Sequence, residues 1–431
     1  MSWRPSRRAL PAEIPGHERL VEFFGVRLRL VVAIVAAGVA GGGFGAAYLW
    51  TLDRVHDGVG PQHWSELGQI GVLVSAGLLV SVLVYALGHP ADVELLVDNI
   101  HVPDAEHEHP ARLRSLLPVS LLCIGVGGTL GPEAPVVTTT GTVGHRLAVR
   151  WGLEPDDVRV VAITGMAAGF AVLFGAPLGG ALFALEIPHR RGIGYSEAAV
   201  PACIGAVLGY AFSTAAGRFG LAPIWELPLI DEIAWIDLVW AVVAGLLGAV
   251  IGLVFTGLVR AGTVAVRHLP AVSRPAIGGV ALGLLAIASP YALTNGELQI
   301  DELAVGAAVS TLALAAIVKL TAAAVCVVTG WRGGFIIPLF FVGFCVGRVV
   351  VDLLPGATEW AFVVAVMIAA NVSVTKTPLG STLVVLEMAG ATVLPGALVA
   401  ALVSLVVTSP LAVIASQRDR VDAYGSDDDP I

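Results

Sequence analysis

Long apolar stretches alternate with short polar segments along most of the chain. About 20 apolar residues suffice to cross a bilayer as an α-helix, and several stretches approach that length or exceed it. The pattern therefore predicts an all-α polytopic membrane protein. The apolar stretches cover residues 30–52, 70–87, 116–130, 136–149, 158–174, 197–214, 238–260, 275–293, 303–328, 359–370, 378–388 and 394–415.

Composition supports this class and excludes others. The 431 residues are 56% hydrophobic and 13% charged, whereas a soluble domain carries about 25% charged residues. The net charge is -9 and no segment forms a basic face, so we expect no nucleic-acid partner. The four cysteines lie far apart in apolar stretches, which favours buried thiols over disulfides or metal ligands. We therefore expect no metal and no cofactor.

Polar segments at two places bear on topology and on metal binding. Arg4, Arg7 and Arg8 favour a cytoplasmic N-terminus, because basic residues are enriched on that side of a membrane. The charged segment 91–114 contains three histidines among several carboxylates. A metal site is conceivable there, but alternating ligands in one short run with no second cluster favour a solvated loop.

One ionisable side chain interrupts an otherwise apolar region rich in glycine and proline. Glu133 lies between Pro132 and Pro135 in the segment 126–144. A carboxylate at the bilayer centre costs about 2.5–3.5 kcal/mol on insertion scales, and broken backbone at membrane depth is tolerated where it lines a cavity. We therefore interpret this segment as a site. The alternative is that Glu133 caps a broken helix or pairs with Arg146 or Lys319.

The two halves of the chain contain similar segments. Residues 176–186 and 377–387 share a Pro-Leu-Gly start and a Leu-Glu end, and a glycine-rich break with a proline precedes each. Glycine- and proline-interrupted segments in corresponding positions of two halves indicate a transporter binding site. Free N–H groups at such helix starts favour an anion. A chance match of a common apolar pattern is the alternative to duplication.

Four segments together resemble the CLC family of chloride channels and proton-coupled anion exchangers. The segment 131–135 resembles the family's Gly-x-Glu-Gly-Pro motif, 174–186 its Pro-Leu helix, 334–338 its Gly-x-Phe-x-Pro motif, and 376–388 its late helix that ends in Leu-Glu-Met. They occur in the family's order. The resemblance is to a prokaryotic type without C-terminal CBS domains.

The resemblance implies a fold of two inverted-topology repeats built from short tilted helices, and a homodimer with one pore per subunit. We expect a cytoplasmic segment 1–24, transmembrane halves 25–216 and 217–415, and an acidic tail 416–431, in a protein of the cell membrane. It also implies that Glu133 is the gating glutamate. The expected anion-binding residues are Gly131, Pro132, Glu133, Ala134, Gly334, Phe335, Ile336, Gly88 and His89.

The chain departs from the family pattern at four positions. Gly88-His89-Pro90 is the candidate for the first signature, but it lacks the serine that usually contacts the anion. Ile187 occupies the position of the proton-transfer glutamate of the exchangers, and an isoleucine carries no proton. The segment 416–421 offers no pore tyrosine. Ile336 takes the place of the motif phenylalanine, and Phe335 comes one position early.

These observations predict chloride or other small monovalent anion transport across the lipid bilayer, by a passive channel or with weak proton coupling. A fluoride-selective exporter is the nearest alternative, because fluoride carriers of the family also lack the serine. Other classes are a non-anion secondary transporter and an intramembrane enzyme. The sequence contains no Gly-x-Ser-x-Gly or His-Glu-x-x-His motif, so we do not expect an enzyme.

Overall fold

The computed structural model shows a helical protein and describes residues 17–91, 96–97, 100–101, 110–189, 193–217, 224–225, 227–411, 413–414 and 417. Four short 3-10 turns join some of the helices. The α-helices are α1 (His17–Val59), α2 (Glu66–Leu87), α4 (Pro110–Gly125), α5 (Glu133–Arg150), α6 (Pro155–Phe174), α7 (Pro177–Glu186), α8 (Ala199–Ala215), α9 (Trp235–Val266), α10 (Arg274–Ala288), α11 (Glu297–Ala304), α12 (Val309–Thr329), α13 (Ile336–Val351), α14 (Glu359–Thr375), α15 (Pro378–Ala389) and α16 (Leu394–Thr408).

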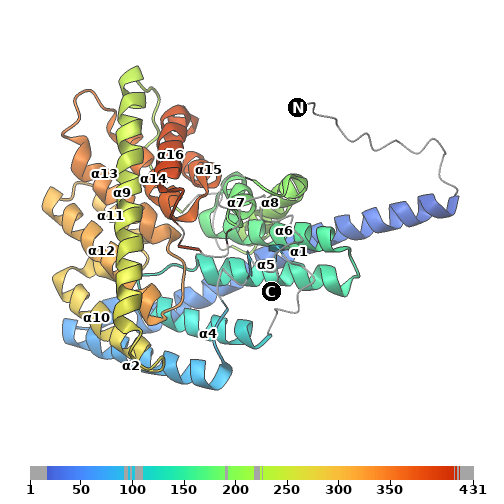
Figure 1. Ribbon diagram of the computed structural model, residues 1–431, viewed down its shortest axis with the longest axis horizontal. Coiled ribbons are helices and arrows are strands. Elements are labelled where there is room, and N and C mark those ends of the chain that lie inside the picture. Colours follow the sequence, from blue (N-terminus) through green and yellow to red (C-terminus); the bar gives the residue numbers. More distant parts are fainter. Residues whose placement is uncertain are drawn as a thin grey trace.

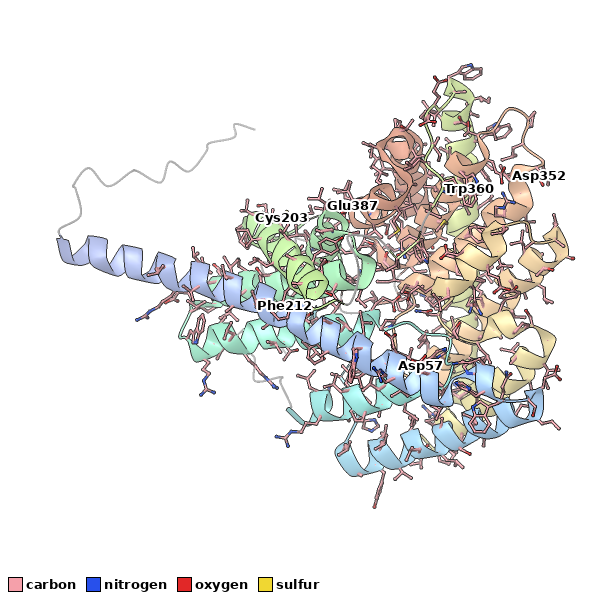
Figure 2. All side chains as sticks on the ribbon, turned by 180° about the vertical axis from the view of Figure 1, so that it is seen from behind. Asp57, Cys203, Phe212, Asp352, Trp360 and Glu387 are labelled. Atoms are coloured by element: carbon pink, nitrogen blue, oxygen red, sulfur yellow. The ribbon has the colours of Figure 1, made fainter. Side chains whose placement is uncertain are left out.

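Seven helical segments among the described residues are long and apolar enough to cross a membrane. They contain α1, α2, α6, α8, α9, α12 and α16. Large apolar side chains on their outer faces are exposed, as Val200 and Phe212 show on α8, where Figure 2 labels Phe212. By contrast, α6 is buried along most of its length and packs against α1, α5, α7 and α8. The predicted polytopic all-α architecture is confirmed.

The helices form two groups that follow the order of the chain (Figure 1). Helices α5 to α8 gather with α1 in one group, and α9 to α16 form the other. The contacts that join the two halves of the chain include α2 along α10 and α7 against α15. Each contact pairs a helix of the first half with one of the second, which places the internal repeat at the centre of the molecule.

The repeat is visible in the backbone as well as in the sequence. Helix α6 ends at Gly175 with φ 64°, and α7 begins two residues later; α14 ends at Lys376 with φ 61°, and α15 begins two residues later. Both positions therefore have the left-handed conformation that ends a helix sharply. The same turn opens both copies of the Pro-Leu-Gly helix, so the repeat predicted from the sequence is confirmed.

Several predicted boundaries differ from the structure. The prediction of a loop up to Arg114 is wrong at its end, because α4 begins at Pro110 and continues past Pro118. The last apolar stretch remains helical only to Thr408. The predicted break in the Glu133 segment is confirmed, since residues 126–132 between α4 and α5 are not helical.

The metal and cysteine predictions can be compared with the described part of the chain. Residues 102–109, which carry two of the three histidines proposed for a metal, lie outside it. Among the residues that are described, no group of three or more histidine, cysteine, aspartate or glutamate side chains could hold a metal ion. Cys123, Cys203, Cys326 and Cys345 are free thiols.

Candidate functional site

The starts of α5 and α13 meet through a short antiparallel bridge. The N–H of Gly131 donates to the carbonyl of Gly334 at 2.7 Å, and the N–H of Gly334 donates back to Gly131 at 2.6 Å. These residues belong to opposite halves of the chain. The bridge directs two helix N-termini, with their free N–H groups and partial positive charge, toward the same point.

The Glu133 side chain occupies this meeting point. Its residue is 1% exposed, and Oε1 accepts a hydrogen bond of 2.6 Å from the N–H of Ile337 in the first turn of α13. Oε2 is buried and has no hydrogen-bond partner among the described residues. The carboxylate of one half of the repeat therefore occupies the helix N-terminus of the other half, where a free anion would be favoured.

Glycine at both ends of the bridge lets the backbone lie close to the Glu133 carboxyl group. A Cβ atom on Gly131 or on Gly334 would overlap the carboxylate atoms. The glycine-rich sequence of the two breaks thus has a steric cause as well as a conformational one. It lets the backbone approach the site closely.

Two cavities adjoin this contact. A cavity of about 250 Å³, here called the central cavity, is lined by Glu133. A second cavity of about 330 Å³ is lined by Pro132 and Ile337, the neighbours of that glutamate in sequence and in space, and by Asp53 and Asp57. The Glu133–Ile337 contact therefore lies at the boundary between the two cavities. Asp57, which lines the second cavity, is labelled on α1 in Figure 2.

Hydroxyl groups and one guanidinium group contribute polarity to the central cavity, which is otherwise mostly apolar. Thr138, one and a half turns after Glu133 on α5, is 2% exposed and its Oγ1 has no partner among the described residues. Thr375 at the end of α14 also lines the cavity, and its Oγ1 donates to the Asn371 carbonyl at 2.9 Å. Arg332, just before the bridge, lines it as well.

The start of α13 is held from a second direction. The Asn371 side chain donates from Nδ2 to the carbonyl of Ile336 at 3.1 Å. This bond orients the first peptide units of α13, including the N–H of Ile337. Asn371 is fully buried, so the bond connects α14 to the site through the protein interior and does not compete with solvent.

The predicted site residues fall into three places. The central cavity is lined by Glu133, Ala134, Gly334, Phe335, Ile336 and Ile187. Gly131 forms the bridge and Pro132 lines the second cavity. Gly88 and His89 line a third pocket that includes Arg332 in its wall. Anion contact by any of these residues stays a prediction.

Neither of the two cations proposed as partners of Glu133 is placed to pair with it. The Lys319 ammonium group donates to the carbonyls of Leu293 and Thr294, at 2.8 and 2.7 Å, and to Oε1 of Gln299. Arg146 is exposed toward the far end of α5. Neither arrangement provides a cation for the Glu133 carboxylate, so the pairing alternative loses its support.

The position of Ile187 is fixed by a residue near the end of the described chain. The Gln417 side chain donates from Nε2 to the carbonyls of Ile187 and Thr375, at 2.9 and 2.8 Å. Both acceptors line the central cavity. A buried amide at residue 417 thus supports one wall of this cavity, within the segment where the resemblance leads one to expect a tyrosine.

Sequence reasoning missed Ile337, Thr138, Arg332 and Asn371. Of these, Thr138 carried a signal: it is part of a Thr-Thr-Thr run in the segment already selected as a site. Helical spacing from Glu133 did not distinguish it from its two neighbours. The N–H of Ile337 carried none, because any non-proline residue supplies the same group.

Comparison with known proteins decides the family. Residues 105–409 match the family model described as voltage gated chloride channel, which is more than half of the chain. The protein belongs to the CLC family. A chloride/fluoride channel protein of Pseudomonas syringae is 28% identical over 404 residues, covering 88% of this chain and 83% of its own length. The H(+)/Cl(-) exchange transporter ClcA of Vibrio parahaemolyticus is 25% identical over 362 residues, covering 75% of this chain and 74% of its own.

Solved CLC structures share the fold. A CLC-type fluoride/proton antiporter superposes with a TM-score of 0.78 at 20% identity, over 94% of this chain and 100% of that one. A slow cyanobacterial Cl-/H+ antiporter gives 0.76 at 21% identity, over 89% and 94%. The protein is thus an integral membrane protein of a family of anion channels and anion/proton antiporters, with the CLC arrangement of inverted repeats.

Proposed function

We propose that this CLC protein carries chloride through the central cavity and that the Glu133 carboxylate closes the path. One observation carries the proposal: Oε1 of Glu133 accepts a hydrogen bond from the N–H of Ile337 at the boundary between two cavities. A negatively charged carboxylate and an anion are alternative ligands for that N–H group. The path is closed when the carboxylate is hydrogen-bonded to this N–H group.

Protonation provides the opening step. A charge-assisted hydrogen bond is roughly twice as strong as a neutral one, so a neutral carboxyl group binds the N–H of Ile337 less well. The chloride ion then competes successfully for the helix N-terminus. Because Oε2 has no partner among the described residues, it is the oxygen that receives the proton in this scheme. The anion therefore competes with the Glu133 carboxylate for the N–H of Ile337, and protonation of that carboxylate favours the anion.

Thr138 supplies the hydroxyl that the first signature lacks. Its Oγ1 lines the central cavity, is buried, and has no partner in the described part of the chain. Burying an unsatisfied hydroxyl is costly, and an anion in the cavity would satisfy it. We assign Thr138 Oγ1 as a hydrogen-bond donor to the transported anion.

Proton transfer beyond Glu133 is weak or absent in this proposal. Ile187 lines the central cavity where the exchangers carry a glutamate, and its side chain has no exchangeable proton. The neighbouring amide of Gln417 holds the wall and does not titrate. Passive flow of anions, or weakly coupled exchange, follows from this lining.

Fluoride is the second candidate ion. The observation in its favour is the position of Gly88 and His89, which line a separate pocket and leave the central cavity without the family's serine ligand. The Pseudomonas syringae relative is named as a chloride/fluoride channel protein, and one structural neighbour is a fluoride/proton antiporter. A buried hydroxyl such as Thr138 also suits fluoride, a strong hydrogen-bond acceptor.

Purified protein in phosphatidylcholine vesicles tests both candidates. Chloride and fluoride electrodes report efflux, and a pH electrode reports coupled proton movement in the same samples. Chloride efflux with little proton uptake supports the leading proposal, and fluoride efflux in preference to chloride supports the second. Movement of neither ion would overturn both and would favour a transporter for a different solute.

The proposal includes a homodimer in the cell membrane, with one pore per subunit and a cytoplasmic N-terminus. Its support is the family resemblance and the exposed apolar face of α8, where Figure 2 labels Cys203 and Phe212. Light scattering of the protein in detergent, corrected for bound detergent, distinguishes a dimer from a monomer of 44.3 kDa.

A further inference from the structure

A third pocket lies beside the central cavity, and its charged side chains are basic. It measures about 470 Å³ and is formed where the end of α2, the start of α10 and the end of α12 meet. Its lining includes the guanidinium-bearing Arg274 and Arg332 and the imidazole of His89. Among the described residues, no aspartate or glutamate lines it. We call it the basic pocket.

The basic side chains of this pocket differ in exposure. His89 is exposed, while Arg274 and Arg332 are partly buried. The Arg274 side chain is held in place by the carbonyl of Leu269, which accepts from Nε at 3.2 Å. Two guanidinium groups in the wall give the pocket a positive potential, and such a lining concentrates anions.

Arg332 connects the basic pocket to the central cavity. It lines both, as does Val327. The Nε atom of Arg332 is buried and finds no hydrogen-bond acceptor among the described residues. Buried guanidinium groups are normally paired, so this donor is available for an acceptor that enters either space. Glu133 and Arg332 thus place one negative and one positive group in the same central cavity.

We infer that the basic pocket is a second anion site, in which Arg332 and Arg274 hold a small monovalent anion before it enters the central cavity. The inference rests on the proposed anion transport and adds an entry route to it. An anion bound there moves into the central cavity and accepts a hydrogen bond from the N–H of Ile337 when the Glu133 carboxylate is protonated. Arg332 acts as a binding residue of this route and has no part in the opening step.

The test is the dependence of initial flux on anion concentration in phosphatidylcholine vesicles. We expect Arg332→Gln to raise the half-saturating concentration of the transported ion roughly tenfold, the size expected of one partly screened charge close to the anion. Arg274→Gln should raise it less. Arg332→Lys, which keeps the charge, should restore most of the apparent affinity. The matched control is Arg150→Gln, an exposed arginine at the end of α5, which should behave as the unmodified protein.

Ionic strength gives an independent readout that a structural role would not move. Adding an impermeant salt should lower flux at low anion concentration in the unmodified protein, and should have little further effect in Arg332→Gln. If Arg332→Gln does not fold, the same comparison with Arg274→Gln decides the question. If Arg332→Gln and Arg274→Gln have the same half-saturating anion concentration as the unmodified protein, the inference is overturned while the proposed function stands. Absence of flux in the unmodified protein overturns the proposed function itself.

Discussion

Oε1 of Glu133 lies 2.6 Å from the backbone nitrogen of Ile337, which joins the first turn of α5 to the first turn of α13. The two helices come from opposite halves of an inverted repeat. The contact has two functional features: it is buried, and it leaves the second carboxylate oxygen without a partner in the described chain. A single proton therefore changes the charge at the boundary between two cavities.

Replacing Glu133 with glutamine should remove the pH dependence of anion flux. The unmodified protein should conduct faster as the pH falls, because protonation weakens the hold of the carboxylate on the N–H of Ile337. Glu133→Gln mimics the neutral form at every pH, so its flux should be high and flat. Efflux from vesicles, measured with ion electrodes from pH 8 to about 4.5, checks this prediction. The lower limit is close to the ordinary pKa of a glutamate carboxyl group.

The control for that measurement is Glu154→Gln, an exposed carboxylate at the start of α6. It should retain the pH profile of the unmodified protein. If Glu133→Gln instead follows the same pH profile as the unmodified protein, while melting at a similar temperature, Glu133 is not the gate.

Thr138 should matter through its hydroxyl group rather than its shape. Thr138→Val keeps the volume and removes the donor, and a hydrogen bond to a charged group contributes about 1.5–3 kcal/mol. We therefore expect the half-saturating anion concentration to rise tenfold or more. Thr138→Ser should remain close to the unmodified protein. Flux measured against anion concentration distinguishes the variants.

Thr142→Val is the matched control for the Thr138 prediction. Its hydroxyl lies one turn further along α5 and donates to the carbonyl of Thr138 at 2.7 Å, so it is already satisfied within the helix. An unchanged apparent affinity in Thr138→Val would show that the anion binds without this hydroxyl. Another residue would then have to replace the family's serine as the hydrogen-bond donor.

The two copies of the Pro-Leu-Gly helix cap each other. Glu186, the last residue of α7, accepts from the N–H groups of Leu379 and Gly380 at the start of α15, at 3.1 and 2.7 Å. Glu387, near the end of α15, accepts from the N–H of Gly179 at the start of α7 at 2.6 Å. Figure 2 places Glu387 between the helices of the two halves.

Loss of either cap should destabilise the protein, and loss of Glu186 should cost more. Glu186 is fully buried, whereas Glu387 is partly exposed, so solvent replaces a lost cap more easily at Glu387. Each buried N–H left unpaired costs about 1–3 kcal/mol. Thermal melting in detergent should rank the unmodified protein above Glu387→Ala, and Glu387→Ala above Glu186→Ala. Equal melting temperatures for the three proteins would mean that the caps contribute little to the contact between α7 and α15.

Local sequence signals located the site, and tertiary contacts completed it. The proline and glycine residues around Glu133 and the repeated Pro-Leu-Gly starts predicted where the helices break, because these residues limit backbone conformation wherever they occur. The partner of Glu133 was not predictable, since Ile337 contributes only a main-chain N–H. The placement of Thr138 and Arg332 in one cavity depends on how α5, α12 and α13 pack, and spacing along the chain does not encode it.

Lys376 combines a strained backbone with a buried ammonium group, and its replacement separates the two effects. Its φ of 61° matches that of Gly175 in the other half, and a non-glycine residue there costs roughly 1 kcal/mol. The Nζ atom donates to the carbonyls of Ser373 and Thr408 and to Oγ1 of Thr408, which ties the end of α14 to α16.

Two variants of Lys376 should therefore lose stability by different amounts. Lys376→Ala removes the hydrogen bonds of the ammonium group and keeps the strained φ, whereas Lys376→Gly removes the same bonds and relieves the strain. We expect Lys376→Gly to be less stable than the unmodified protein and Lys376→Ala to be less stable again by about 1 kcal/mol. Thermal melting in detergent measures each contribution, with Gly175→Ala as the comparison that places a side chain at the corresponding left-handed position. A Lys376→Gly protein at least as stable as the unmodified one would show that the link between α14 and α16 contributes less than the strained backbone costs.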